Sequence, residues 1–207
     1  MCLEISQARL GGRRLETQVR LCAGRRSYFL IGFEREEDAR RVVAVLDKRM
    51  ERFGLTLHSD NTRLLPCWRP PRSQPRGKGP ATFEFVGFTF YWARTRKGPW
   101  RMACKTRRAS LRRAKMSIYD WCRRHRHWPI KDQHAALTRR LRGHCNYFGV
   151  NGNYRSMSRL IESVKRSWYK WLRRRSQRTR LNWERFSEML RGWPLPRPRI
   201  TVQIWDG

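Results

Sequence analysis

Residues 157–172, MSRLIESVKRSWYKWL, carry the clearest structural pattern in this chain. The apolar residues recur at intervals of three and four, which is the period of one face of an α-helix. They are Met157, Leu160, Ile161, Val164, Trp168, Trp171 and Leu172. We therefore predict a long amphipathic helix over about 155–175. No acidic residue lies between Val164 and Asn182, so this helix should carry a basic face opposite its apolar one.

Three shorter patterns of the same kind predict further helices. One begins near residue 106 and ends by Pro129, a second covers about 132–142 and stops at Gly143, and a third is capped by Asn182. Their apolar residues are Leu111, Ala114, Ile118, Trp121 and Cys122 in the first, Leu137 and Leu141 in the second, and Trp183, Phe186, Met189, Leu190 and Trp193 in the third. Because Trp168, Trp171, Trp183 and Trp193 lie on apolar stripes, we expect them in the core. Prolines at 194, 196 and 198 predict an extended tail, and residues 200–205 form either a last strand or a disordered end.

The N-terminal half shows strand patterns around one helix. Residues 28–33, 55–57 and 62–65 are short apolar runs that predict strands, and a helix is expected from Glu36 to a stop at Gly54. Residues 66–81, rich in proline, form a loop. Residues 83–91 predict one strand covered on both faces, with Gly87 marking a close backbone approach, and residues 100–104 return as its partner. Residues 1–27 show no regular pattern and are expected to be irregular.

The amino-acid composition says more about the binding partner of the chain than about its fold. The chain has 207 residues with 48 Lys and Arg against 16 Asp and Glu, a formal net charge of +32. Such an excess is typical of proteins that bind nucleic acid, because phosphates supply dense negative charge. A membrane is not expected as the partner, since no run of 18 apolar residues and no signal-peptide pattern occurs. We expect the chain in the cytosol or nucleoid of a bacterium.

No motif predicts catalysis, a metal site or a cofactor. The six cysteines include no C-x-x-C pair. His125 and His127 could share a metal, but contact with solvent or phosphate is the favoured interpretation, because no thiolate or carboxylate cluster lies nearby. Tyr147 and Tyr169 lie off the stripes or in a loop and are the candidates for stacking on a nucleotide.

Several motifs, in order, resemble a known family. Residues 141–154 (LRGHCNYFGVNGNY), 168–177 (WYKWLRRRSQ), 183–186 (WERF) and 194–200 (PLPRPRI) are similar to the maturase-specific, or thumb, domain of group II intron-encoded reverse transcriptases. Upstream, residues 31–66 and 83–90 (FEFVGFTF) resemble the last part of the reverse transcriptase palm. The resemblance implies a palm segment at 28–104, a helical thumb at 105–200 and a tail at 201–207, with residues 1–27 outside the family.

The same resemblance implies functional residues. A primer-grip-like hairpin would contain Phe85, Val86, Gly87 and Phe88. The helical part would hold intron RNA or an RNA/DNA primer-template duplex. Its RNA-contacting cations and tyrosines would be Arg107, Arg108, Arg112, Arg113, Arg139, Arg140, Arg142, Tyr147, Lys165, Arg166, Tyr169, Lys170, Arg173, Arg174, Arg175, Arg178 and Arg180. The fold class expected is α+β, a strand–helix–strand and hairpin segment followed by a basic helical bundle.

Departures from the family pattern decide the function we expect. Ser27 and Tyr28 stand where the family has the two catalytic aspartates, the first aspartate of the chain is Asp38, and Asn61 replaces a usual lysine. Two-metal phosphoryl transfer lacks its carboxylates here. The N-terminus is therefore expected to reflect a frameshift or internal start. We expect a truncated maturase that binds intron RNA, assists splicing and extends no primer alone with Mg²⁺. The alternatives are a piece of an active RNA-directed DNA polymerase, completed by a separate chain that supplies the aspartates for Mg²⁺, and a decayed remnant that does not fold.

Overall fold

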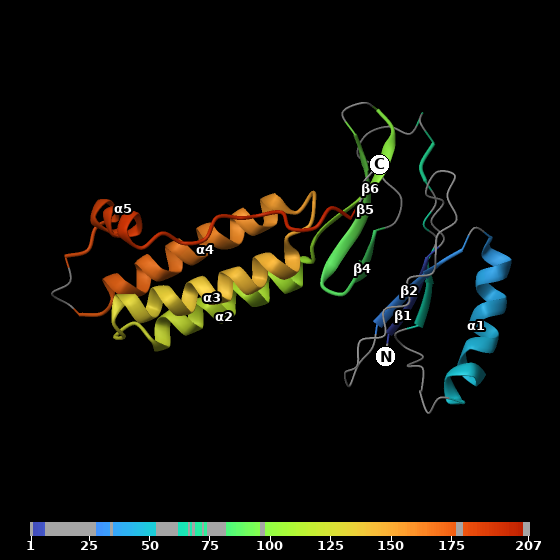
Figure 1. Ribbon diagram of the computed structural model, residues 1–207, viewed down its shortest axis with the longest axis horizontal. Helices are drawn as coiled ribbons and strands as arrows, with labels where there is room; N and C mark the ends of the chain where they lie inside the picture. The colour runs from blue at the N-terminus through green and yellow to red at the C-terminus, as the bar shows by residue number, and fades with distance from the viewer. Residues whose placement is uncertain are drawn as a thin grey trace. The chain divides into compact units, whose positions relative to one another are not determined.

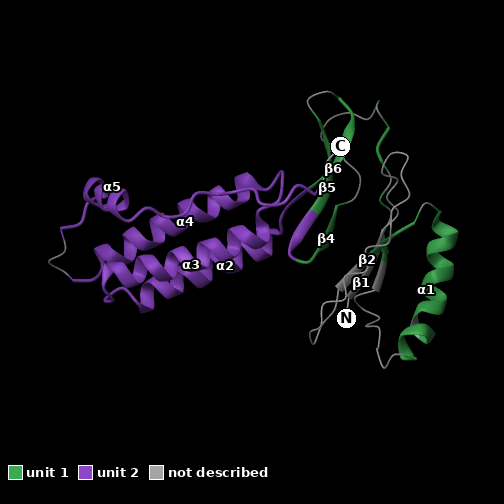
Figure 2. Cartoon of the chain, in the orientation of Figure 1, with its two compact units in different colours: residues 1–86, 90–103 green, residues 87–89, 104–207 purple. Residues whose placement is uncertain are grey.

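The computed structural model describes residues 2–6, 28–33, 35–52, 62–65, 67, 69–71, 73, 82–95, 98–176 and 180–204 (Figure 1). Two compact units divide the chain (Figure 2). Unit 1 is Met1–Val86 with Phe90–Ala103, and unit 2 is Gly87–Thr89 with Cys104–Gly207. The described part has the predicted α+β class.

The elements follow one another from strands to helices. The strands are β1 (Cys2–Ser6), β2 (Tyr28–Gly32), β3 (Thr62–Leu65), β4 (Phe83–Phe85), β5 (Phe88–Arg94) and β6 (Trp100–Thr106). The helices are α1 (Glu36–Glu51), α2 (Arg108–Arg124), α3 (Ile130–Phe148), α4 (Tyr154–Arg173) and α5 (Trp183–Gly192). The strands predicted at 28–33 and 62–65 and the five predicted helical regions are confirmed, with changed bounds.

The first sheet of unit 1 has the order β2-β1-β3, and both pairs of strands run parallel. Helix α1 packs against it through buried Ala39, around which Ile31 and Leu64 gather. The prediction that residues 1–27 are irregular is wrong for β1. Its five residues are too short and too polar to stand out as a strand, and pairing on both sides supplies the hydrogen bonds that their own pattern does not predict. Residues 7–27 and the strand predicted at 55–57 lie outside the described residues.

The second sheet, β4-β5-β6, corrects the single strand predicted over 83–91. The chain turns back at Val86 and Gly87, whose φ angles are 44° and 82°. Two consecutive residues with positive φ make the tight turn that joins antiparallel strands. The alternating pattern was therefore correct on both sides of the turn, but it belongs to two strands. The returning strand predicted at 100–104 is confirmed and extends to Thr106.

Unit 2 is built on a bundle of three helices in which α3 runs antiparallel to α2 and α4 (Figure 1). Its core contains the whole predicted stripe of α4 together with Ile118, Trp121 and Cys122 of α2. A neutral amide is also buried in this core: the Gln133 Oε1 accepts a hydrogen bond from the Trp168 indole N–H at 2.9 Å. Helix α2 contacts α4 extensively, so the two neighbouring parallel helices share one face of the bundle.

Helix α3 is longer than its sequence pattern predicts. We expected it to stop at Gly143, yet it continues to Phe148. Glycine costs only about 1 kcal/mol in a helix interior. Beyond it, Cys145 is buried in the bundle core. Burial of the last turn therefore outweighs the weak propensity of one residue.

Helix α5 begins as predicted, because the Asn182 side chain accepts a hydrogen bond from the Arg185 backbone N–H at 2.9 Å. Phe186 is its buried anchor and packs edge-on against Trp168. The expectation that Trp183 lies in the core is wrong, since 46% of it is exposed. Trp193 is partly buried. Helix α5 has only ten residues and packs on one edge of the bundle. Its first stripe residue, Trp183, therefore stays at the exposed rim of the core.

A buried asparagine joins the end of β6 to the start of α4. Asn153 is fully buried, and its Oδ1 accepts from the Thr106 backbone N–H at 2.8 Å. Its Nδ2 donates to Thr106 Oγ1 and to the Phe148 carbonyl, both at 2.8 Å. These bonds satisfy the side chain completely and fix the first turn of α4 beside the first turn of α2.

The tail after α5 returns along the bundle as an extended segment, as the prolines predict (Figure 1). Val202 forms a parallel bridge with Val150, and the Thr201 backbone N–H donates to the Gly149 carbonyl at 2.6 Å. A Cβ on Gly149 would come closest to the Cys145 carbonyl of α3, and it would lie 2.7 Å from Thr201 Oγ1 and 2.8 Å from the Arg199 carbonyl of the tail. Glycine is thus required both by the last turn of α3 and by the tail.

We expect Gly149→Ala to lower the free energy of unfolding by about 1–3 kcal/mol, because the tail or the end of α3 must shift. Gly143→Ala is the matched control. An added Cβ there meets nothing within 4 Å. It should therefore raise stability by about 0.5–1 kcal/mol. Chemical denaturation of both variants measures the difference, and equal effects would contradict the close packing described around Gly149.

Candidate nucleic-acid interface

A hollow of about 710 Å³ lies where the first turns of α2 and α4 meet the end of β6. The described residues that line it include five cations and no carboxylate; the cations are Lys105, Arg108, Arg112, Lys115 and Arg159. Thr89, Thr106, Leu111 and Ser156 complete the lining. Hydroxyl groups and cations together are the donors that phosphate oxygens accept from.

Helix geometry explains why these cations converge. On α2, residues 108, 112 and 115 follow one another at intervals of four and three, so they occupy one face. Arg159 reaches the same space from α4. The Asn153 hydrogen bonds hold both first turns in place. The N-terminus of α2 adds a partial positive charge to the hollow, since the first backbone N–H groups of a helix have no partner within it.

The cationic face continues toward the other ends of the same helices. Tyr119 and Arg123 extend the α2 row at intervals of four, and Lys170 Nζ of α4 donates to the Tyr119 hydroxyl at 2.8 Å. Arg123 lies over the Trp171 ring, 5.8 Å from its centre. We call this face the α2–α4 seam; its cations are Arg108, Arg112, Lys115, Arg123, Arg159, Lys170 and Arg174. Within the described part of the chain, none of these seven forms an ion pair with a carboxylate.

The predicted RNA-contacting residues do not form one ridge. Arg108, Arg112, Lys170 and Arg174 lie on the seam. The remaining described members lie elsewhere on the helices or after them: Arg107, Arg113, Arg139, Arg140, Arg142, Lys165, Arg166, Arg173, Arg175 and Arg180. Arg175 donates to the Trp128 carbonyl, and Arg140 covers the Trp121 ring. Arg178 lies outside the described residues.

Three cations of the hollow were missed by the sequence interpretation. Lys105 precedes α2, and Lys115 and Arg159 are single cations between apolar residues of their stripes. The spacing 108, 112, 115 could have placed Lys115 beside Arg108. No pattern along the chain could have placed Arg159, because its position depends on the pairing of α2 with α4.

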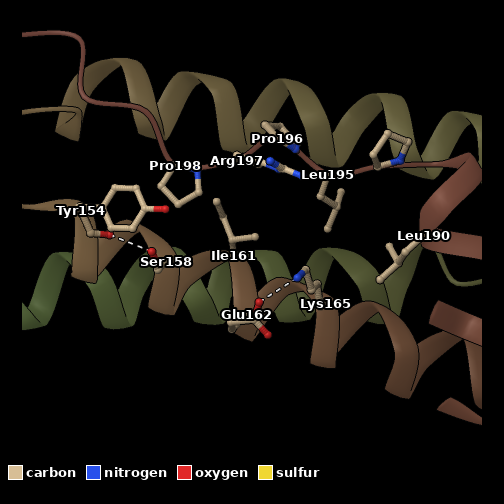
Figure 3. Close-up of a pocket in the computed structure, with 11 residues that line it drawn as sticks. Tyr154, Ser158, Ile161, Glu162, Lys165, Leu190, Leu195, Pro196, Arg197 and Pro198 are labelled. Atoms are coloured by element: carbon tan, nitrogen blue, oxygen red, sulfur yellow. Dashed lines mark hydrogen bonds and ion pairs between the residues drawn. The ribbon is translucent and has the colours of Figure 1, made fainter. Parts of the chain in front are cut away.

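A second hollow, of about 340 Å³, lies between α4 and the proline-rich tail (Figure 3). Its charges are mixed, since Lys165 Nζ forms an ion pair with Glu162 at 2.8 Å (Figure 3). Lys165, one of the predicted RNA-contacting residues, is therefore partly neutralised by its neighbour. The hollow is also lined by Ile161, Leu190 and the five residues of the tail's proline segment, 194–198. It suits an extended polyanion less well than the seam does.

The two predicted stacking tyrosines differ in their surroundings. Tyr147 is 52% exposed and contacts the Phe88 and Phe148 rings. Tyr169 packs against Trp183 and Phe186, so its ring is engaged in contacts within the helical unit. Their role in nucleotide stacking stays a prediction, as does the primer-grip role of residues 85–88.

The polar groups of the described residues give little support for other chemistry. Burial raises the pKa of the Cys104 thiol to about 11 and that of Cys122 to about 12, so both remain protonated at neutral pH. No group of three His, Cys, Asp or Glu side chains comes together within the described ranges. His125 instead stacks on Trp121, and its Nδ1 lies 2.9 Å from the Trp121 carbonyl.

The described structure is thus an α+β chain with a cationic seam on a three-helix bundle. No protein-family model, curated protein or solved structure matches this chain. Among the described helices, none combines the length and the apolar character needed to cross a lipid bilayer.

Proposed function

We propose that this chain binds structured RNA through the α2–α4 seam, as an RNA-binding part of a group II intron-encoded reverse transcriptase, or maturase. The observation that carries the proposal is the hollow lined by five cations and no carboxylate. A solvated helix face usually mixes charges of both signs, and this one does not. The motif resemblance over residues 141–200 supports the choice of intron RNA as the partner.

The contacts would be made to the phosphate backbone. Guanidinium groups donate paired hydrogen bonds to phosphate oxygens, and backbone contacts recognise the shape of a folded RNA without reading its sequence. Neutralising phosphates also lowers the repulsion between RNA helices that pack together. Binding would thereby hold one folded form of an intron and assist its splicing, with no covalent step performed by this chain.

A salt titration tests the proposal directly. If most of the seven seam cations contact phosphates, the logarithm of the association constant should fall against the logarithm of salt concentration with a slope of about −5. Binding of the full chain to a folded group II intron RNA would be measured by filter retention between low and physiological salt. An unrelated duplex of equal length serves as the reference RNA. A flat titration, together with equal affinity for both RNAs, would contradict the proposal.

A further inference from the structure

Three cations surround one tryptophan at the far end of the seam. The charged ends of Arg123, Lys170 and Arg174 lie 5.6–5.8 Å from the centre of the Trp171 ring. All three side chains are exposed. One cation over an aromatic face is a common stabilising contact, but three like charges around the same ring repel one another.

Within the described residues, none of these three cations forms an ion pair with a carboxylate that would balance its charge. The C-terminal ends of α2 and α4 contribute partial negative charge, which favours cations there but is weaker than a full anion. Trp171 itself is only 8% exposed, and its Nε1 is buried without a hydrogen-bond partner among the described residues.

We propose that Arg123, Lys170 and Arg174 with Trp171 form a second phosphate-binding site, which takes phosphodiester groups of the same RNA that occupies the hollow. This inference rests on the proposed function. A phosphate between the three cations would remove their mutual repulsion, and one of its oxygens could accept from the Trp171 indole once the flexible cationic side chains shift. Lys170 remains anchored on the Tyr119 hydroxyl.

The distance between the two sites sets the length of RNA that reaches both. Arg108 and Arg123 are the ends of the seam on α2, and 15 residues of helix separate them. At 1.5 Å per residue this is about 22 Å. Base pairs rise about 3.4 Å in B-form DNA and somewhat less in the A-form helix of RNA, so the seam spans roughly eight RNA base pairs. A stem of four base pairs should therefore fill one site, whereas a stem of eight should fill both.

RNA hairpins with stems of 4, 8 and 12 base pairs test the second site, each made with a 5′-hydroxyl so that only phosphodiesters are offered. For the unaltered chain we expect affinity to rise about tenfold from 4 to 8 base pairs and little from 8 to 12. The variant R123Q/K170Q/R174Q should lose that rise. Its affinity for every stem should equal the affinity of the unaltered chain for the stem of four base pairs. A charge-matched control, K131Q/R191Q/R199Q, alters exposed cations outside the seam and outside the predicted RNA contacts, and it should keep the rise.

The outcomes separate this inference from the proposed function. If R123Q/K170Q/R174Q keeps the normal dependence on stem length while its circular dichroism and melting temperature are unchanged, the second site is overturned and RNA binding by the hollow stands. If the charge-matched control loses the rise as well, the length dependence reflects net charge and the second site is again overturned. If the unaltered chain binds none of the hairpins, the proposed function fails, and the inference fails with it.

Discussion

Replacing Arg108, Arg112 and Arg159 together by glutamine should weaken RNA binding about 100-fold at physiological salt. Each guanidinium contributes a charge-assisted contact of about 1 kcal/mol, and three such losses amount to two orders of magnitude in the dissociation constant. The slope of the logarithm of the association constant against the logarithm of salt concentration should also become less negative by about 2–3, since fewer counterions are released. All three side chains are exposed, so the fold should be retained.

The control for this variant is K131Q/R139Q/R142Q, which removes the same charge from exposed positions of α3 that do not line the hollow. It should weaken binding by less than about fivefold, through the general field of the protein alone. This control variant also tests the sequence prediction that Arg139 and Arg142 contact RNA. An equal loss in both variants would mean that affinity follows net charge, and the seam would no longer be the preferred surface.

The largest effect on stability is expected from Trp168→Ala. Trp168 is fully buried at the centre of the bundle, and its indole donates to Gln133. Truncation leaves a large cavity against Phe186 and a buried amide oxygen without its donor, which together should cost about 3–5 kcal/mol. For a unit of this size that corresponds to a melting temperature lower by roughly 15 °C or more.

Trp183→Ala provides the same substitution at a second tryptophan of a predicted apolar stripe. Because Trp183 lies at the exposed rim of α5, its removal should cost no more than about 1 kcal/mol. Thermal unfolding followed by circular dichroism at 222 nm compares the two variants. A similar loss of stability in both variants would contradict the packing described for α5, in which Trp183 contributes much less buried surface than Trp168 does.

Trp168 and Trp183 both lie on predicted apolar stripes, but only Trp168 is buried. Over the twenty residues of α4 every member of the predicted apolar stripe is buried, because a long central helix must turn one continuous face to the core. Ser167 is also buried and is the one position that the stripe did not include. Over the ten residues of α5 the same period placed Phe186 correctly and Trp183 wrongly. A short helix at the edge of a bundle covers the core with only part of its stripe.

Two corrections have a common cause in tertiary structure. Gly143 would end an isolated helix, but burial of Cys145 continues α3 past it. Alternation over residues 83–91 indicates extended backbone equally well in one strand or two. The turn at Val86 and Gly87 depends on backbone angles that the pattern does not contain.

The sequence by itself determined the α+β class, the apolar stripes of the bundle helices, the Asn182 cap and the excess of positive charge, because each depends on residues close together along the chain. Only the tertiary structure decided which cations share a surface. Helix periodicity places Arg108, Arg112 and Lys115 on one face of α2, but Arg159 and Lys170 join them only because α4 packs beside α2 in the same direction. Charge is a property of composition, whereas a binding surface requires that separate helices bring their charges together.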